Sequence, residues 1–176
     1  MRLYRLFLSL LLALFVVGIA GPIAAQPSLR VGGGISSPNG RMGDFLGSGY
    51  HGRVMLNLGV PVAPVSLRFE GAMHRFNASG TDAGEMDQLN GTLGAEVTLG
   101  LAGIEPYLFV GWGKYRQEYS ADFGPGDSQT HPGYHAGFGV EAGILGLGGF
   151  VEVRIVNVSR DISDSRYVPL TVGIRF

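Results

Sequence analysis

The sequence contains no cysteine, and charged residues make up only 15% of it. Without cysteine there can be no disulfide bond, no thiolate nucleophile and no thiolate metal site. The 13 basic and 14 acidic residues nearly cancel, and the basic residues do not cluster, so nucleic acid is not expected as a partner. The fold must therefore be held together by backbone pairing and packing alone.

Amphipathic helices are also missing. After the first 25 residues no segment repeats apolar residues with a helical period, and glycine accounts for 30 of the 176 residues. Glycines such as Gly137, Gly139 and Gly143 lie inside apolar segments, where they would weaken a helix. In strands they indicate sharp curvature or close backbone approach, which a narrow barrel requires.

Residues 1–25 have the layout of a secretory signal peptide. Arg2 and Arg5 precede an apolar run, and the small pair Ala24 and Ala25 follows it. The alternative is a retained anchor helix, but an apolar core of about fifteen residues is short for a full span. We expect cleavage near residue 25 and a mature domain over 26–176, with 11 basic and 14 acidic residues once Arg2 and Arg5 are removed.

Strict alternation of apolar and non-apolar residues is clearest in residues 167–176. Seven other segments repeat this pattern, which predicts strands with one apolar face. On the fifth segment both faces carry large residues, and we expect Tyr107 and Phe109 to point inward. The eight expected strands cover residues 28–35, 50–58, 65–75, 88–99, 105–116, 133–144, 149–158 and 167–176.

The expected connections alternate between short turns and longer polar links. Short Gly/Pro turns end the second, fourth and sixth segments, and the longer links cover 36–49, 77–87, 117–132 and 159–166. An even number of strands of about ten residues with this alternation is typical of an all-β, up-and-down transmembrane barrel. A soluble lipocalin-type barrel, with its apolar face turned inward around a ligand, is the alternative.

Nine charged residues fall on the non-apolar face of the expected strands. In a transmembrane barrel they belong inside, because each would cost about 2 to 4 kcal/mol if it faced the middle of the bilayer. They could form a selective pore or a catalytic cluster. With five arginines and four glutamates in a narrow lumen, a packed salt-bridge plug is favoured. The set is Arg30, Arg53, Arg68, Glu70, Glu96, Glu141, Glu152, Arg154 and Arg175.

The chain resembles the outer-membrane β-barrel domain family, the OmpA/OmpX-type small eight-stranded barrels. The resemblance is carried by the signal peptide, the eight alternating segments, the Pro106–Tyr107–Leu108 start of the fifth strand and the ending YVPLTVGIRF. It implies a location in the bacterial outer membrane and contact with outer-membrane lipid or lipopolysaccharide. Because the sequence ends with the barrel, we expect no appended peptidoglycan-binding domain. The resemblance also implies that the barrel-assembly machinery recognises the terminal pattern: Val168, Leu170, Val172, Ile174 and Phe176.

Catalytic, metal and cofactor sites are not expected. His51, His74 and His135 fall on the inner face without a spacing that suits a metal, so we interpret them as hydrogen-bonded members of the plug. Some small outer-membrane barrels are lipid A deacylases that place a serine two residues after the catalytic histidine. No histidine here is followed in that way.

The leading hypothesis is a non-enzymatic outer-membrane barrel with a structural or adhesin-like role. Its loops would be the interaction surface, and the expected loop 117–132, with Tyr119 and Phe123, is the preferred contact site for a surface ligand. A narrow pore or a channel for hydrophobic solutes is the alternative function.

Overall fold

Eight strands and one short helix make up the described part of the chain. The computed structural model describes residues 27–60, 63–78, 84–100, 103–121, 124–144, 147–160 and 164–176, so the predicted signal peptide lies outside them. All eight expected strands are confirmed, and no described helix is long and apolar enough to span a membrane. The elements are β1 (Pro27–Asn39), α2 (Arg41–Phe45), β2 (Leu46–Gly59), β3 (Val65–Ala78), β4 (Gly84–Thr98), β5 (Glu105–Ala121), β6 (Gly124–Ile144), β7 (Leu147–Val158) and β8 (Ser165–Arg175).

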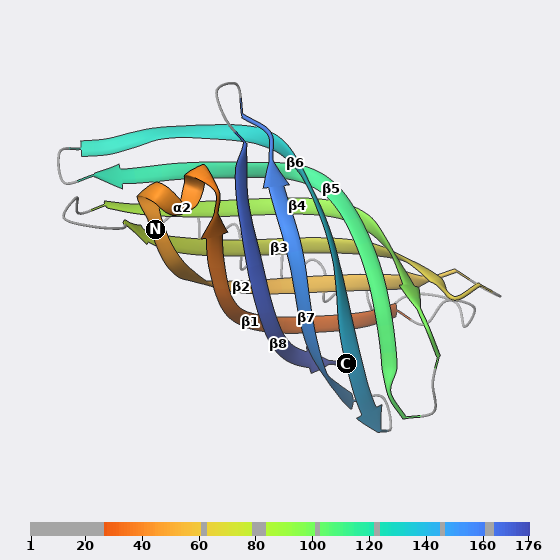
Figure 1. The fold of residues 1–176 in the computed structure, drawn as a ribbon. Helices are drawn as coiled ribbons and strands as arrows, with labels where there is room; N and C mark the ends of the chain where they lie inside the picture. Colours follow the sequence, from red (N-terminus) through yellow and green to blue (C-terminus); the bar gives the residue numbers. More distant parts are fainter. Residues whose placement is uncertain are drawn as a thin grey trace.

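The strands close into an up-and-down antiparallel barrel in which each strand pairs with the next and β8 pairs with β1 (Figure 1). The pairs stagger around the barrel. Starting at Arg30 and crossing each strand to its direct partner, the path reaches Ser165 on β8, whereas the direct partner of Arg30 across the seam is Arg175. A stagger of ten residues requires strongly tilted strands, roughly 35 to 45° in barrels of this kind.

Apolar side chains cover the outside of the barrel. On β5, Leu108, Val110 and Trp112 are each more than half exposed, while Tyr107 and Phe109 are buried in the lumen as expected. The same alternation continues on the other strands, and polar and charged side chains fill much of the interior. A soluble ligand carrier would have the opposite polarity, so that alternative is wrong.

The alternation of loop lengths is not found, because the strands continue through most of the expected long links. The expected loop 117–132 is a hairpin in which β5 and β6 remain paired as far as Ala121 and Gly124. Period-2 apolarity ends earlier than the strands do, because the outward positions of their outer parts carry polar and charged residues in place of apolar ones. We call the end of the barrel where β3 connects to β4 and β5 to β6 the loop end, and the opposite end the turn end. The outer parts of β3 to β6 form a wall at the loop end (Figure 1).

The outward face of this wall is charged. Beyond Trp112, the outward positions of β5 are occupied by exposed Lys114 and Arg116. Arg75 on β3 forms a two-pronged ion pair with Asp87 on β4, with contacts of 2.7 and 2.8 Å. The hydrogen bond to Asp87 and its negative charge raise the pKa of the Arg75 guanidinium. Charged groups at this height indicate that the apolar band, and hence the bilayer, ends just above Trp112.

Several glycines on β6 make room for aromatic rings in the lumen. A Cβ at Gly133 would lie 2.7 Å from Cε2 of Tyr115 and 2.8 Å from the carbonyl oxygen of Asn157. A Cβ at Gly139 would overlap the Tyr107 ring. On the outer face, by contrast, a Cβ at Gly91 would meet nothing within 4 Å. The inner glycines are therefore required by close approach, as the sequence indicated.

Replacing Gly133 with alanine should destabilise the barrel by about 1 to 3 kcal/mol, because the methyl group overpacks the lumen. The matched replacement of Gly91 should be neutral or slightly stabilising, because the methyl group enters open space and alanine restricts the unfolded chain. Urea unfolding in detergent micelles, followed by Trp112 fluorescence, measures both free energies. Equal effects of the two substitutions would show that lumen packing does not require glycine at 133.

Candidate functional site

The lumen brings together all nine charged residues expected there. Eight of them are at most 7% exposed, and Arg175, near the end of β8, has a side chain that is 29% exposed. They form two groups connected by Arg68, which contacts carboxylates of both. Alternation on each strand predicts which residues point inward, but only the closed barrel shows which of them meet.

The central group contains three arginines and two glutamates. Arg154 makes a bidentate contact with Glu70 at 2.7 and 2.8 Å and also contacts Glu152. Arg53 and Arg68 reach Glu152 at 3.0 and 2.7 Å. These contacts join β2, β3 and β7 through the lumen, which backbone pairing alone cannot do. Bidentate charge-assisted bonds of this kind are the strong ones.

Two guanidinium groups of the central group lie close to the same aromatic ring. The guanidinium carbons of Arg68 and Arg154 lie 4.2 and 4.8 Å from the centroid of the Phe109 ring. At the turn end Arg30 lies in the same way over Tyr107, at 4.6 Å. Because the face of an aromatic ring attracts cations, these contacts offset the excess of arginine over glutamate.

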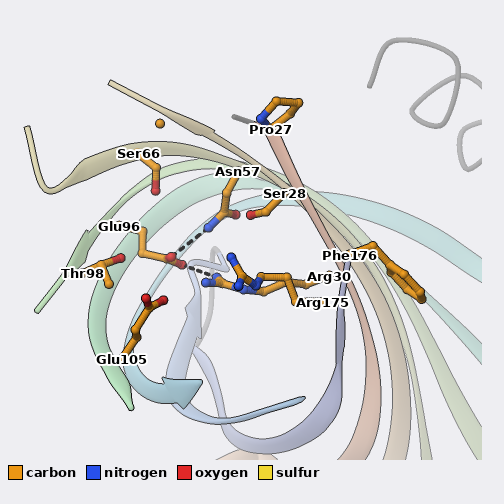
Figure 2. A pocket seen from close by; sticks show the side chains of 11 residues that line it. Pro27, Ser28, Arg30, Asn57, Ser66, Glu96, Thr98, Glu105, Arg175 and Phe176 are labelled. Atoms are coloured by element: carbon orange, nitrogen blue, oxygen red, sulfur yellow. Dashed lines mark hydrogen bonds and ion pairs between the residues drawn. The ribbon is translucent and has the colours of Figure 1, made fainter. Parts of the chain in front are cut away.

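The second group lies at the turn-end mouth of the lumen (Figure 2). Arg30 contacts Glu96 at 2.7 Å and Glu141 at 2.8 Å, and Arg175 also contacts Glu141. Asn57 donates a hydrogen bond to Glu96 at 2.8 Å. Arg30, Asn57, Glu96 and Arg175 border a polar cavity of about 290 Å³ that is partly open to solvent. The mouth is therefore wet, whereas the central group is sealed from solvent.

Towards the loop end, the charges give way to hydrogen-bonded neutral groups. The hydroxyl of Ser36 lies 2.9 Å from Nδ1 of both His51 and His74, and Nε2 of His51 lies 2.9 Å from the Thr171 hydroxyl. His135 pairs with the Tyr115 hydroxyl at 3.2 Å. Ser36 escaped the sequence analysis because the first strand was expected to end at residue 35. Counting every second residue inward from Arg30, through positions 32 and 34, would have placed Ser36 in the lumen.

The Ser36 cluster does not have the properties of a catalytic site. A hydroxyl has one proton, so Ser36 can donate to one histidine and must accept from the other. Its side chain is fully buried, which leaves no place for a substrate beside the oxygen. Among the described residues no group of three or more histidine, cysteine, aspartate or glutamate side chains could hold a metal ion.

An apolar cluster closes the loop end of the lumen. Met42 of α2 inserts its side chain into the barrel, where six buried residues of β3, β4, β5, β7 and β8 surround it. Sequence reasoning missed Met42, because residues 36–49 were expected to form a polar link. The buried partners are Phe76, Met86, Tyr115, Val156, Val158 and Tyr167, with Leu46 and Tyr119 packed beside them.

The two aromatic residues expected in a contact loop are not placed as expected. Tyr119 lies within β5, half-buried, and its hydroxyl accepts a hydrogen bond of 2.8 Å from Arg160. The Arg160 guanidinium also lies 5.6 Å from the ring centroid, so Tyr119 faces the inner side of the wall. Phe123 lies outside the described residues. The expectation that Tyr119 belongs to a long loop is wrong, because β5 stays paired with both of its neighbours beyond it.

The outward residues of β8 lie where the terminal pattern places them. Leu170, Val172, Ile174 and Phe176 are between 44% and 57% exposed, and Val168 is partly buried. A barrel with an apolar exterior and a buried ionic interior defines the class of small transmembrane β-barrels.

The chain belongs to the outer membrane protein beta-barrel domain family, whose pattern it matches over residues 9–174. This membership, together with the barrel neighbours described next, places the protein in the bacterial outer membrane. A comparison with curated proteins gives no match.

Among solved structures, the chain is similar to Neisserial surface protein A, with a TM-score of 0.67 and 15% identity over 85% of this chain and 95% of that one. It is also similar to Ail, the attachment invasion locus protein of Yersinia pestis, with a TM-score of 0.53 and 11% identity over 85% and 98% of the two chains. At this level of identity the likeness shows the shared fold.

Removing one carboxylate from the central group should be costly. Replacing Glu152 with glutamine leaves Arg53, Arg68 and Arg154 with Glu70 and Glu96 as their only anionic contacts among the described residues. Breaking buried ion pairs in this way costs about 3 to 5 kcal/mol. Replacing Asp87 with asparagine, in the exposed pair with Arg75, should cost less than about 1 kcal/mol. Unfolding free energies in urea measure both, and comparable losses would contradict a dominant role for the buried cluster.

Proposed function

We propose that this protein is a non-enzymatic outer-membrane barrel with a structural and adhesin-like role. Residues 1–25 direct export and are removed. The turn end faces the periplasm and the loop end faces the cell exterior, as in bacterial barrels of this type. The projecting wall of β3 to β6 is the interaction surface, in place of the long loop 117–132 expected from the sequence.

An unpaired strand edge carries this proposal. Within the described residues β7 pairs with β6 only from Gly133 on, and one further hydrogen bond reaches Pro132, so residues 124–131 of β6 have a partner on the β5 side alone. Ser159 donates its N–H to the carbonyl of Pro132 at 3.0 Å, so the backbone carbonyl of Pro132 points away from β5, towards the β7 side. In an antiparallel ladder alternate residues point the same way, so Ser128 and Thr130 offer N–H and C=O groups at this edge.

An extended segment of another protein suits this edge. Edge strands are templates for pairing, and proteins usually protect them with lysine or a covering segment. Proline also protects strand edges, and Pro125 and Pro132 stand near the two ends of this one, but residues 126–131 between them contain no lysine, arginine or proline. A second copy in the same membrane is a poor occupant of this edge. Two copies related by a two-fold axis along the membrane normal would each tilt their strands by 35 to 45°, so their edge strands would cross at roughly 70 to 90° and could not pair.

Two further partners follow from the outer surface. Exposed Lys114 and Arg116 lie just beyond Trp112, at a height suited to the phosphates of lipopolysaccharide. The exposed apolar residues of β8 with Phe176 serve as the recognition pattern for the barrel-assembly machinery. The lumen is closed in two ways: the ionic groups act as a plug, and the apolar cluster around Met42 excludes water beyond it.

Replacing Ser128 and Thr130 with proline tests the edge. Proline removes only the N–H groups that point away from β5, so the hairpin should persist while pairing with a partner is lost. We expect bacteria that display the double variant to adhere to cultured epithelial cells at least tenfold less than those displaying the natural protein. The matched control replaces both residues with valine, which keeps the N–H groups. Equal adhesion of the proline variant and the control would reject the edge as the contact surface.

A closed lumen predicts the absence of ion conduction. In planar lipid bilayers the folded protein should give no steady conductance above that of the bare membrane, because the lumen lacks a continuous aqueous path. A steady conductance that changes when Glu96 or Arg154 is replaced with glutamine would contradict the plug. It would establish the narrow pore as the function instead.

A further inference from the structure

The seam where the barrel closes places two arginines opposite each other. Leu29 and Phe176 exchange both backbone hydrogen bonds, with N–O distances of 3.0 and 2.8 Å. The next pair along β1 and β8 is Arg30 and Arg175. A pair that follows a hydrogen-bonded pair in an antiparallel ladder is the close one, with Cα atoms about 4.5 Å apart. Like charges placed directly opposite each other destabilise strand pairing.

A carboxylate from a third strand lies against both arginines. Oε2 of Glu141 on β6 lies 2.8 Å from Nε of Arg30, and its Oε1 contacts Nε of Arg175. Glu141 is only 2% exposed. Among the described residues it is the only anionic contact of Arg175, whereas Arg30 also contacts Glu96. Each oxygen of Glu141 thus holds one side of the seam.

The position of Glu141 in the barrel makes this contact conditional. β6 pairs with β5 and β7 and touches neither strand of the seam through the backbone. Glu141 can reach the two arginines only across the lumen, after β6, β7 and β8 have taken their places in the curved sheet. If β1 and β8 pair before that stage, the two guanidinium groups meet without a carboxylate between them.

We infer that Glu141 is a latch that makes closure of the β1–β8 seam depend on prior assembly of the β6 side of the lumen. Arg30 and Arg175 repel each other until Glu141 is in place, and they then hold the seam through it. The device favours closure of the complete barrel over premature pairing of its first and last strands. It rests on the fold alone and does not depend on the proposed adhesive role.

The test separates insertion from closure during refolding into detergent micelles or lipid vesicles. Trp112, the only tryptophan, is lipid-facing and reports insertion by fluorescence, while the mobility of the unboiled band on a gel reports closure. In E141Q, insertion should keep its natural rate while closure slows at least tenfold. In the double variant E141Q/R175Q, which removes the like-charge pair, closure should return to within about threefold of the natural rate.

The control uses the other carboxylate of the mouth. Glu96 contacts Arg30, Arg68 and Asn57 but not Arg175, so R175Q should not restore E96Q. Rescue of both glutamate variants by R175Q, or of neither, would overturn the latch and leave Glu141 as one ion pair among others. If E141Q does not fold at all, the single variant R175Q decides. Closure of R175Q that is no slower than closure of the natural protein supports the inference. Closure and insertion of R175Q that are both slowed by the same factor overturn it.

Discussion

The closed ladder of backbone hydrogen bonds is the constraint on which the rest of this structure depends. Once β8 pairs with β1, no strand edge is left within the apolar band, so the barrel can meet lipid on every side. Closure also determines whether each side chain faces lipid or the lumen, because alternation sends every second side chain into the narrow interior. Charged residues that could not face lipid then gather at distances where they must pair, as Arg154 and Glu70 do.

The composition of the lumen changes along the barrel axis in a way that suits its two ends. At the turn end Arg30 and Glu96 border a cavity that solvent can enter, and the central ion pairs follow. Hydrogen-bonded histidines come next, and His74 marks the boundary with the apolar cluster, since its ring stacks on Phe76 and meets the edge of Tyr167. An apolar layer at the loop end withholds water from the ion pairs beneath it, which strengthens them.

The sequence predicted all eight strands and the inward position of all nine charges, because period-2 alternation records which side of a sheet meets lipid. It could not predict the outer parts of β5 and β6. There the outward face meets water in place of lipid, so residues such as Arg116 and Thr130 break the apolar alternation even though they are paired. It also missed Met42, whose burial depends on a helix turning back over the mouth of the barrel. Contacts across the lumen were likewise hidden, because alternation on single strands contains no information about register between distant strands.

The abundance of glycine and the large buried side chains have a common cause in the fixed cross-section of the barrel. An eight-stranded lumen is just wide enough to be filled by side chains, so a large residue on one strand requires a small one nearby. On β6 the inward positions 133, 137 and 139 are glycines, and a Cβ at each would meet the ring of Tyr115, Phe109 or Tyr107 on β5. The rings of Tyr107 and Phe109 in turn contact arginines in the lumen. Gly137 and Gly139 therefore help to position these cations, although they carry no functional group themselves.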